Sequence, residues 1–88
     1  MFEWDENKNK INTEKHDVSF EFAKEAFNDP NHLILADESH SLGEDRYFCI
    51  GEVDGAIITV RFVVRGEKIR IIGAGYWRKG RKLYESRH

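Results

Sequence analysis

Positions 57–64 read Ile-Ile-Thr-Val-Arg-Phe-Val-Val, a run rich in β-branched residues that is typical of a β-strand. Asp54-Gly55 precedes the run and Arg65-Gly66 follows it. Because glycine adopts the positive backbone torsions that tight connections need, both flanks favour turns between neighbouring strands. Residues 68–72, Lys-Ile-Arg-Ile-Ile, then supply a hairpin partner. The second half of the chain is therefore predicted to form an antiparallel meander rather than a parallel sheet.

Residues 1–30 contain the pattern of two helices. Residues 5–16 include neither proline nor glycine, and Asp5 can cap the first turn, which predicts a helix from about Glu6 to His16. Asn12, a polar residue of this helix, is expected to bond within the fold. A second helix is expected between a cap at Ser19 and a stop at Pro30, which disfavours helical geometry at the residue before it. Its apolar stripe consists of Phe20, Ala23, Ala26 and Phe27.

Shorter patterns complete the expected fold. Phe2 and Trp4 alternate with Glu3 in the two-residue period of a short strand, whose aromatic side chains are expected in the core. Residues 33–36 and 47–50 are further strands, and residues 76–87 form a basic tail or short last helix, interrupted at Gly80. The predicted fold class is α+β, with two N-terminal helices packed across one face of a twisted, mainly antiparallel sheet of about four strands and a short C-terminal helix. By length, residues 1–88 are expected to form a single domain.

The cysteine and histidine content favours neither a disulfide nor a metal centre. Cys49 is the only cysteine, and the histidines show no zinc-ligand spacing. No cofactor is therefore expected, and the least favoured alternative is a metal site built from His16, His32, His40 and His88. The N-terminal segment lacks the basic region and apolar run of a secretory signal, and no segment approaches 18 uninterrupted apolar residues. We therefore expect a cytoplasmic protein without membrane contact.

The charges are placed unevenly along the chain. Residues 1–44 carry 11 acidic and 4 basic side chains, whereas residues 45–88 carry 5 acidic and 10 basic ones. A basic half suits contact with a polyanion such as nucleic acid, because cations that neutralise phosphates release counterions. The alternative is an ordinary solvated surface, since many small domains carry charge of one sign on one element without binding nucleic acid.

Apolar, acidic and basic residues also recur at offsets that resemble those of a known family. At the N-terminus these are Phe2-Glu3-Trp4-Asp5, Lys8, Asn12, Lys15-His16, Val18-Ser19-Phe20, Glu21, Ala23, Phe27 and Asp29-Pro30. Further along they are Asp37, His40, Gly43-Glu44, Arg46, Arg70-Ile71-Ile72 and Leu83-Tyr84-Glu85. The pattern resembles the BrnT family of bacterial type II toxins, which are small ribonucleases with a RelE-like fold. The resemblance implies an RNA substrate, a cognate antitoxin as partner, and contact with DNA only through the antitoxin.

RNA cleavage without a metal requires three things of the protein. It must deprotonate the 2′-hydroxyl, stabilise negative charge on the phosphate, and protonate the leaving oxygen. His40, Glu44 and Arg46 form the tightest polar constellation and are the first acid–base candidates, because histidine titrates near neutral pH and arginine binds phosphate through two parallel hydrogen bonds. The alternative is a solvated turn in which Glu44 and Arg46 form a surface ion pair.

A second group of candidates lies on the predicted hairpin. Arg61 and Arg65 share one parity on their strand, and Arg70 lies across the turn, so two or three guanidinium groups are expected on one sheet face. There they could clamp a phosphate. The alternative is an ordinary sheet whose second face is wet or covered by a partner.

The basic tail interleaves aromatic residues with cations, a composition that lets bases stack while phosphates are neutralised. Its RNA-binding candidates are Trp77, Lys79, Arg81 and Tyr84. The tail also follows a departure from the family pattern. Where many members resemble Ile-Ser-Ala-Arg, this chain has Ile72-Gly73-Ala74-Gly75, so Arg78 is a candidate for the role of the missing arginine. The alternative reading of the tail is a hydrophobic dock with a solvated basic face.

Two functions follow from these patterns. The first is a ribonuclease toxin that cleaves RNA by general acid–base chemistry, with arginines stabilising the phosphate and without a metal. The second is a non-catalytic binding module that keeps the scaffold and serves as antitoxin partner or corepressor, which the two glycines of the departure favour.

Overall fold

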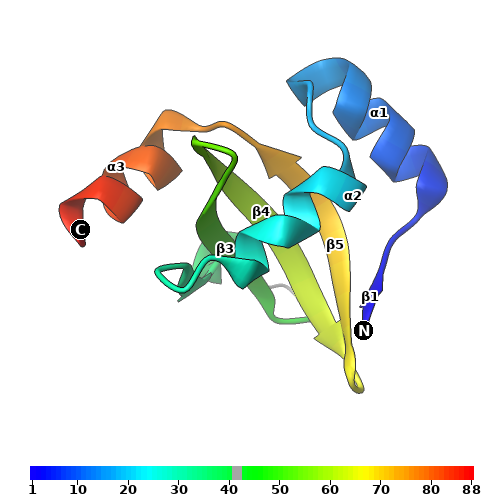
Figure 1. Cartoon of the computed structure of the whole chain (residues 1–88). Helices are drawn as coiled ribbons and strands as arrows, with labels where there is room; N and C mark the ends of the chain where they lie inside the picture. The colour runs from blue at the N-terminus through cyan, green and yellow to red at the C-terminus, as the bar shows by residue number, and fades with distance from the viewer. Residues whose placement is uncertain (41–42) are drawn as a thin grey trace.

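The computed structural model describes residues 1–40 and 43–88, and of His40 it describes only the backbone. Within this part of the chain, five strands form one sheet in the order β1-β5-β4-β3-β2 (Figure 1). Neighbouring strands run antiparallel, except that β1 pairs in parallel with β5. The strands are β1 (Phe2–Glu3), β2 (Leu33–Ala36), β3 (Arg46–Val53), β4 (Ala56–Arg65) and β5 (Lys68–Gly75). The predicted α+β class and the antiparallel meander are confirmed, and the short first strand adds the parallel edge.

Helices lie on both faces of this sheet. They are α1 (Glu6–His16), α2 (Phe20–Ala23), the 3-10 helices η1 (Lys24–Asn28) and η2 (Glu38–His40), and α3 (Arg78–Ser86). Gly51 of β3 lies against the backbone of Ala26 in η1, whereas its neighbour Ile50 lies beside Gly80 in α3. Because successive residues of a strand face opposite sides of a sheet, η1 and α3 cover opposite faces. The predicted pair of N-terminal helices therefore packs on one face, and α3 packs on the other.

The first helix has the predicted bounds. Asp5 caps it by accepting hydrogen bonds from the N–H groups of Asn7 and Lys8, at 2.8 and 3.3 Å. It ends where Asp17 takes a left-handed conformation with φ 56°. The second predicted helix starts at its Ser19 cap as α2 and continues as η1, which ends before Pro30. No helix among the described residues is long and apolar enough to cross a membrane.

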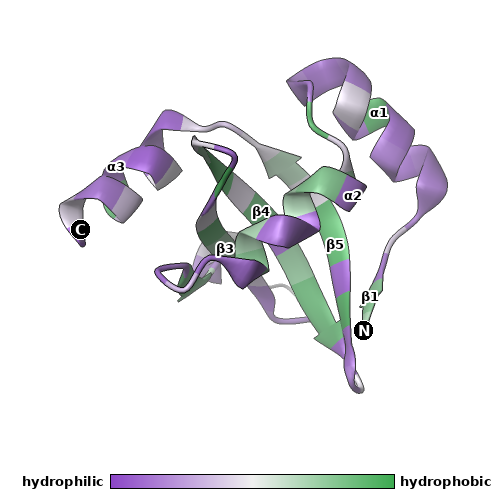
Figure 2. Cartoon of the chain, in the orientation of Figure 1, coloured by the Kyte–Doolittle hydropathy of each residue, from purple (hydrophilic) through white to green (hydrophobic). Residues whose placement is uncertain are grey.

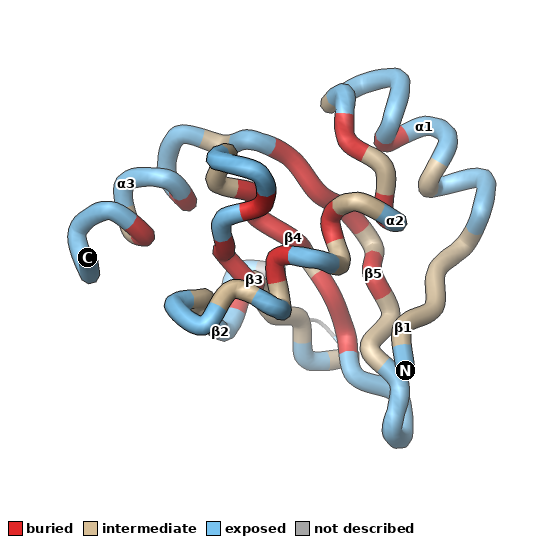
Figure 3. Tube along the Cα trace, viewed as in Figure 1, coloured by how far each residue is buried: buried red, intermediate tan, exposed pale blue. Residues whose placement is uncertain are grey.

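The core lies between the sheet and the two N-terminal helices. Phe20, Ile58, Val60 and Ile71 are almost completely buried there, and Figures 2 and 3 show the apolar, buried stretches of β4 and β5 beneath α2. Burying side chains of this size contributes about 1.5 to 3 kcal/mol each. Trp4 packs its ring edge-on against Phe20 with 6.2 Å between centroids, as expected of a core aromatic.

Gly80 corrects one prediction. The sequence suggested that Gly80 interrupts the last helix, but α3 runs through it, and Gly80 is buried. A Cβ atom built there would collide with Oγ1 of Thr59 on β4. The missing side chain thus lets α3 approach the sheet closely, which is a packing role that local sequence does not distinguish from a helix break.

Candidate nucleic-acid interface

Basic side chains from three strands share the sheet face opposite α1 and α2. The strand register pairs Val63 with both Arg46 on β3 and Arg70 on β5, and it pairs Arg65 with Lys68. Cross-strand partners share a face, and so do residues two apart on one strand. We call this surface the cationic face, formed by Arg46, Arg61, Arg65, Lys68 and Arg70. The expectation that Arg61, Arg65 and Arg70 share one face is therefore confirmed by the register.

A β-bulge shapes the far end of the cationic face. Arg61 pairs with Gly73 but Phe62 pairs with Ile71, so Ile72 is the extra residue on β5. An extra residue reverses the facing of every later position on its strand. As a result, Gly73 and Gly75 face the cationic side while Ala74 points into the core.

Two glutamates balance part of the charge on this face. Glu44 accepts two hydrogen bonds from Arg65, at 3.0 Å from Nε and 3.1 Å from Nη2. Glu3 on β1 lies 3.5 Å from Arg70 and 3.9 Å from Lys68. The side chain of Arg70 is 26 % exposed against 53 % for Arg65, so the Arg70 guanidinium is the more enclosed of the two.

The surrounding arginines set the protonation of Glu44. The hydrogen bond from Arg65 lowers the pKa of Glu44, and the charges of Arg65, Arg46 and Arg70 lower it further, against a smaller opposing effect of burial. Glu44 is therefore ionised at neutral pH. An ionised carboxylate with a lowered pKa can hold an arginine in place, but it cannot act as a general acid there.

The remaining catalytic candidates are Arg46, His40 and Arg78. Arg46 is half-buried at the first position of β3, and it contributes to the charge around Glu44. The side chain of His40 lies outside the described residues, although its backbone in η2 is placed. Arg78 is exposed at the first position of α3, beside Lys79 and Lys82.

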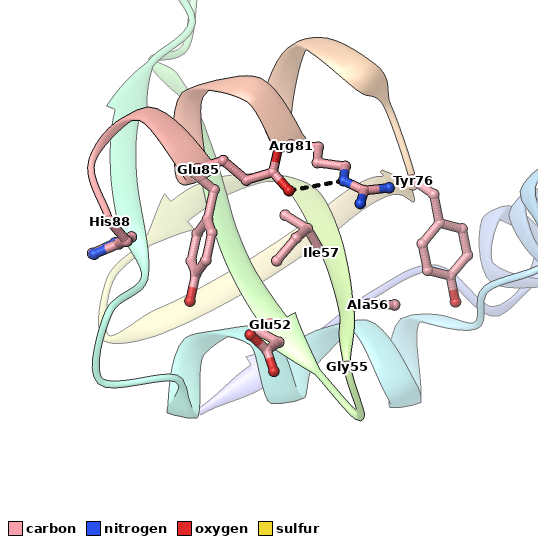
Figure 4. A pocket seen from close by; sticks show the side chains of 9 residues that line it. Glu52, Gly55, Ala56, Ile57, Tyr76, Arg81, Glu85 and His88 are labelled. Carbon is pink, nitrogen blue, oxygen red and sulfur yellow. Dashed lines mark hydrogen bonds and ion pairs between the residues drawn. The ribbon is translucent and has the colours of Figure 1, made fainter.

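The tail candidates divide into two groups on different sides of α3. Trp77 and Lys79 line a groove together with Arg61, next to the cationic face. Arg81 and Tyr84 instead line a second pocket with Glu52, Glu85 and other residues (Figure 4). The structure therefore brings Trp77 and Lys79 to the candidate interface but does not bring Arg81 and Tyr84 there.

Tyr84 and Arg81 have other contacts. The Tyr84 side chain is only 7 % exposed, and its hydroxyl donates a 2.6 Å hydrogen bond to the Asp29 carboxylate. This hydrogen bond, together with burial, raises the pKa of Tyr84 to about 12. Arg81 donates a hydrogen bond to Glu85 at 3.1 Å, which is the dashed line in Figure 4. A buried ring offers no open face to a base, so Tyr84 is not placed to stack on RNA.

Sequence reasoning missed two residues with clear roles. Glu3 lies beside the cationic face and forms an ion pair with Arg70. The alternation of Phe2, Glu3 and Trp4 could have revealed this position, because it turns Glu3 away from the core. Asp29 accepts hydrogen bonds from Tyr84, from the N–H of Glu52 at 2.7 Å and from the N–H of Asn31 at 2.9 Å. No local pattern could have revealed Asp29, since two of its three partners are distant in sequence.

The residues that the structure describes contain no group of three or more histidine, cysteine, aspartate or glutamate side chains placed to hold a metal ion. Arginine and lysine side chains supply the positive charge of the candidate interface. Three strands carry these groups, so their spacing is fixed by sheet register rather than by loops.

Comparison with known proteins adds the family. No curated protein matches the chain. A family model described as "Ribonuclease toxin, BrnT, of type II toxin-antitoxin system" matches residues 4–80. The match runs from Trp4 to Gly80 in α3, and so includes every residue of the cationic face. Because it covers most of the 88 residues, this chain belongs to the BrnT family of ribonuclease toxins in type II toxin–antitoxin systems.

Proposed function

We propose that this BrnT protein cleaves RNA on its cationic face, by general acid–base chemistry and without a metal. The observation that carries the proposal is the gathering of Arg46, Arg61 and Arg70 on one sheet face by strand register. Guanidinium groups bind phosphate through paired hydrogen bonds and stabilise charge that develops during transfer. The family assignment supplies the reaction class, and the face supplies the charge that this reaction needs.

The reaction has three parts. A base removes the proton of a 2′-hydroxyl, the oxygen forms a bond to the adjacent phosphorus, and the bond from phosphorus to the 5′-oxygen breaks as that oxygen receives a proton. His40 is our candidate for the proton transfers, because imidazole has both forms available near neutral pH. Arg46, Arg61 and Arg70 stabilise the phosphate, with Arg78 as a further cation. We assign Glu44 the role of positioning Arg65, since its pKa is lowered.

The cognate antitoxin is the expected partner of the same face. A surface of this charge suits a cover with acidic and apolar segments, which would block access of RNA to the arginines. The complex would contact DNA only through the antitoxin. Such a cover also explains how a cell could hold the toxin in its cytoplasm without damage to its own RNA.

The test is cleavage of labelled RNA by purified protein in the presence of a chelator. We expect discrete products from the parent, and a loss of at least 100-fold in rate for both His40→Ala and Arg70→Ala, the scale of general acid–base and oxyanion contributions. Arg87→Ala is the matched control, because Arg87 follows α3 at the exposed C-terminus. Equal cleavage by all four proteins would place the site elsewhere, and intact RNA with a folded parent would contradict the proposal.

One observation favours a second function, that of a non-catalytic antitoxin partner or corepressor. A Cβ atom built at Gly75 would lie 2.8 Å from two ring carbons of Trp77, so the indole occupies the space that a side chain at this position would need. The arginine of the commoner family pattern therefore has no room here. This function predicts binding of antitoxin or RNA with no RNA products in the same assay.

A further inference from the structure

A groove of about 610 Å³ lies beside the contact between α3 and the sheet, next to the cationic face. Its size lies in the range of sites that hold a small organic group, roughly 300 to 1,000 Å³. Arg61 belongs both to the groove and to the cationic face, so the two are continuous. The proposed cleavage chemistry uses Arg61 but leaves the rest of the groove without a role.

One wall of the groove is an aromatic ring with a fixed position. The Trp77 indole rests against the bare backbone of Gly75, which the β-bulge turns to this side of the sheet. His16 at the end of α1 contacts the same indole edge-on, with 5.4 Å between ring centroids. A ring held on two sides in this way is a preformed surface for stacking, because little conformational freedom remains to be lost on binding.

The remaining lining combines apolar side chains with charges of both signs. Phe48 and Leu83 add apolar surface, and Arg61 and Lys79 contribute cations. Glu38, which is exposed, also lines the groove and adds a carboxylate. A carboxylate accepts hydrogen bonds from amino groups like those on nucleobases, but it repels a phosphate drawn inside. The groove therefore fits a flat, partly apolar group that carries amino groups and is attached to an anion.

We infer that this groove is a nucleobase subsite, in which one unpaired base of the RNA stacks on Trp77 while its phosphates lie on Arg61 and Lys79. The inference rests on the proposed ribonuclease function and narrows its substrate to single-stranded RNA. Bases in a duplex are paired and stacked, so they cannot enter a groove between a helix and a sheet. An unpaired base enters at little cost, and stacking on an aromatic ring then favours it over an empty groove.

The experiment measures binding of an RNA that cannot be cut. A short 2′-O-methyl oligonucleotide of mixed sequence lacks the attacking hydroxyl, and a Trp4→Phe protein leaves Trp77 as the only tryptophan. We expect the single-stranded oligonucleotide to quench Trp77 emission. An oligomer of abasic sugar-phosphate and the same sequence annealed to its complement are expected to leave the emission unchanged, although both carry the phosphates that bind the cationic face.

Two variants sharpen the result. Trp77→Ala is expected to weaken binding of the single strand about tenfold and to leave binding of the duplex unchanged, since loss of one stacking partner affects only an unpaired base. Tyr76→Ala is the matched control, because Tyr76 is a neighbouring exposed aromatic that lines the other pocket. The emission measurement uses the Trp77 ring itself, so it decides the question even if Trp77→Ala does not fold.

Each outcome separates the base subsite from the ribonuclease. If ordinary RNA is cleaved but Trp77 emission is the same with the single-stranded, abasic and duplex ligands, the base subsite is overturned and the ribonuclease stands. That result would also be found if the groove served the antitoxin alone. If the single strand quenches Trp77 and ordinary RNA stays intact, the base subsite stands and the ribonuclease proposal fails.

Discussion

Asn12 joins three segments of the fold through one buried side chain. Its Nδ2 donates hydrogen bonds to the carbonyl oxygens of Val18 and Ala74, at 2.9 and 3.0 Å, and its Oδ1 accepts one from the N–H of Ala74 at 3.1 Å. Asn12→Ala leaves these backbone groups buried without partners, which costs about 1 to 3 kcal/mol for each unsatisfied group. With three such groups, we expect the free energy of unfolding to fall by about 3 kcal/mol or more, measured by urea titration with circular dichroism.

The control for Asn12 lies on the same helix. Lys10→Ala changes an exposed residue of α1 and is expected to stay within about 0.5 kcal/mol of the parent. A similar small effect for Asn12→Ala would mean that water replaces the amide, and that the three segments are held together by apolar packing alone.

Glu44 gives a prediction that separates positioning from proton transfer. Glu44→Gln removes the negative charge that pairs with Arg65, so the cationic face gains one net positive charge. We expect tighter binding of single-stranded RNA at low salt, and a plot of log affinity against log salt that is steeper by about 0.7. Cleavage is expected to persist. The measurement is a titration of uncleavable RNA at several salt concentrations, followed by single-turnover cleavage of ordinary RNA.

Glu14→Gln is the matched control for Glu44, because Glu14 is exposed on α1 away from the cationic face. Glu14→Gln alters the net charge of the protein by the same amount. A difference in RNA affinity between the two variants is therefore due to the position of Glu44 at the cationic face. A Glu44→Gln protein that binds RNA normally but no longer cleaves it would show that Glu44 transfers a proton, and our positioning role would be wrong.

At the scale of elements, the seating of α3 depends on Gly80. In an ordinary helix, Gly→Ala is stabilising by about 1 kcal/mol. Here the added Cβ would collide with Thr59 Oγ1, so we expect Gly80→Ala to destabilise the protein by about 1 to 3 kcal/mol, the usual cost of overpacking. Thermal and urea unfolding measure whether Gly80→Ala lowers the stability instead of raising it.

A double variant tests the cause of that change. Thr59 Oγ1 has no hydrogen-bond partner among the described residues, so Thr59→Ala loses no hydrogen bond. Gly80→Ala combined with Thr59→Ala is therefore expected to recover much of the stability that Gly80→Ala loses, because the colliding oxygen is gone. Additive losses in the double variant would instead locate the strain in the helix backbone.

Elements with local signals could be predicted from sequence, and those with distant partners could not. The bounds of α1 follow from a cap at Asp5 and from the absence of proline and glycine, both of which act within one turn. The bulge at Ile72 and the parallel pairing of β1 depend on strands that approach from elsewhere in the chain. Gly80 shows the same limit, since its role is set by Thr59, 21 positions earlier in the sequence.

At the scale of the whole molecule, the same distinction applies to the candidate interface. The shared face of Arg61, Arg65 and Arg70 follows from alternation along a hairpin, which is a local rule. No local rule predicts which tail residues reach the interface. Lys79 and Arg81 lie on different sides of α3, and only the packing of this helix on the sheet decides which of them lines the groove. Trp77 and Tyr84 are both aromatic residues of the basic tail and could not be told apart from the sequence. In the structure, Trp77 lines the groove, whereas the Tyr84 hydroxyl donates a hydrogen bond to Asp29.

The link between Asp29 and Tyr84 also contributes to the pH dependence of the stability of the molecule. Burial raises the pKa of Asp29, but the hydrogen bonds from Tyr84, Glu52 and Asn31 outweigh it and lower the pKa overall. Its contribution is thus present above the unfolded pKa of about 3.9 and is lost as pH falls through the lower folded value. Tyr84 acts in the opposite direction. Its contribution is present below the unfolded pKa of about 10 and is lost as pH rises through its folded pKa of about 12.

Tyr84→Phe tests the hydrogen bond between Tyr84 and Asp29 alone, because it removes the hydroxyl and keeps the buried ring of this α3 residue. We expect the free energy of unfolding to fall by about 1.5 to 3 kcal/mol between pH 5 and 9, the usual contribution of a hydrogen bond to a charged group. Above pH 10 the tyrosine of the unfolded parent ionises while folded Tyr84 still keeps its proton, so the parent loses this advantage and the two curves converge towards pH 12. Urea midpoints across the pH range measure this, with Tyr76→Phe as the exposed control. Parallel curves up to pH 12 would mean that the hydroxyl does not hold α3 to the turn at Asp29, and that apolar packing of the ring does so instead.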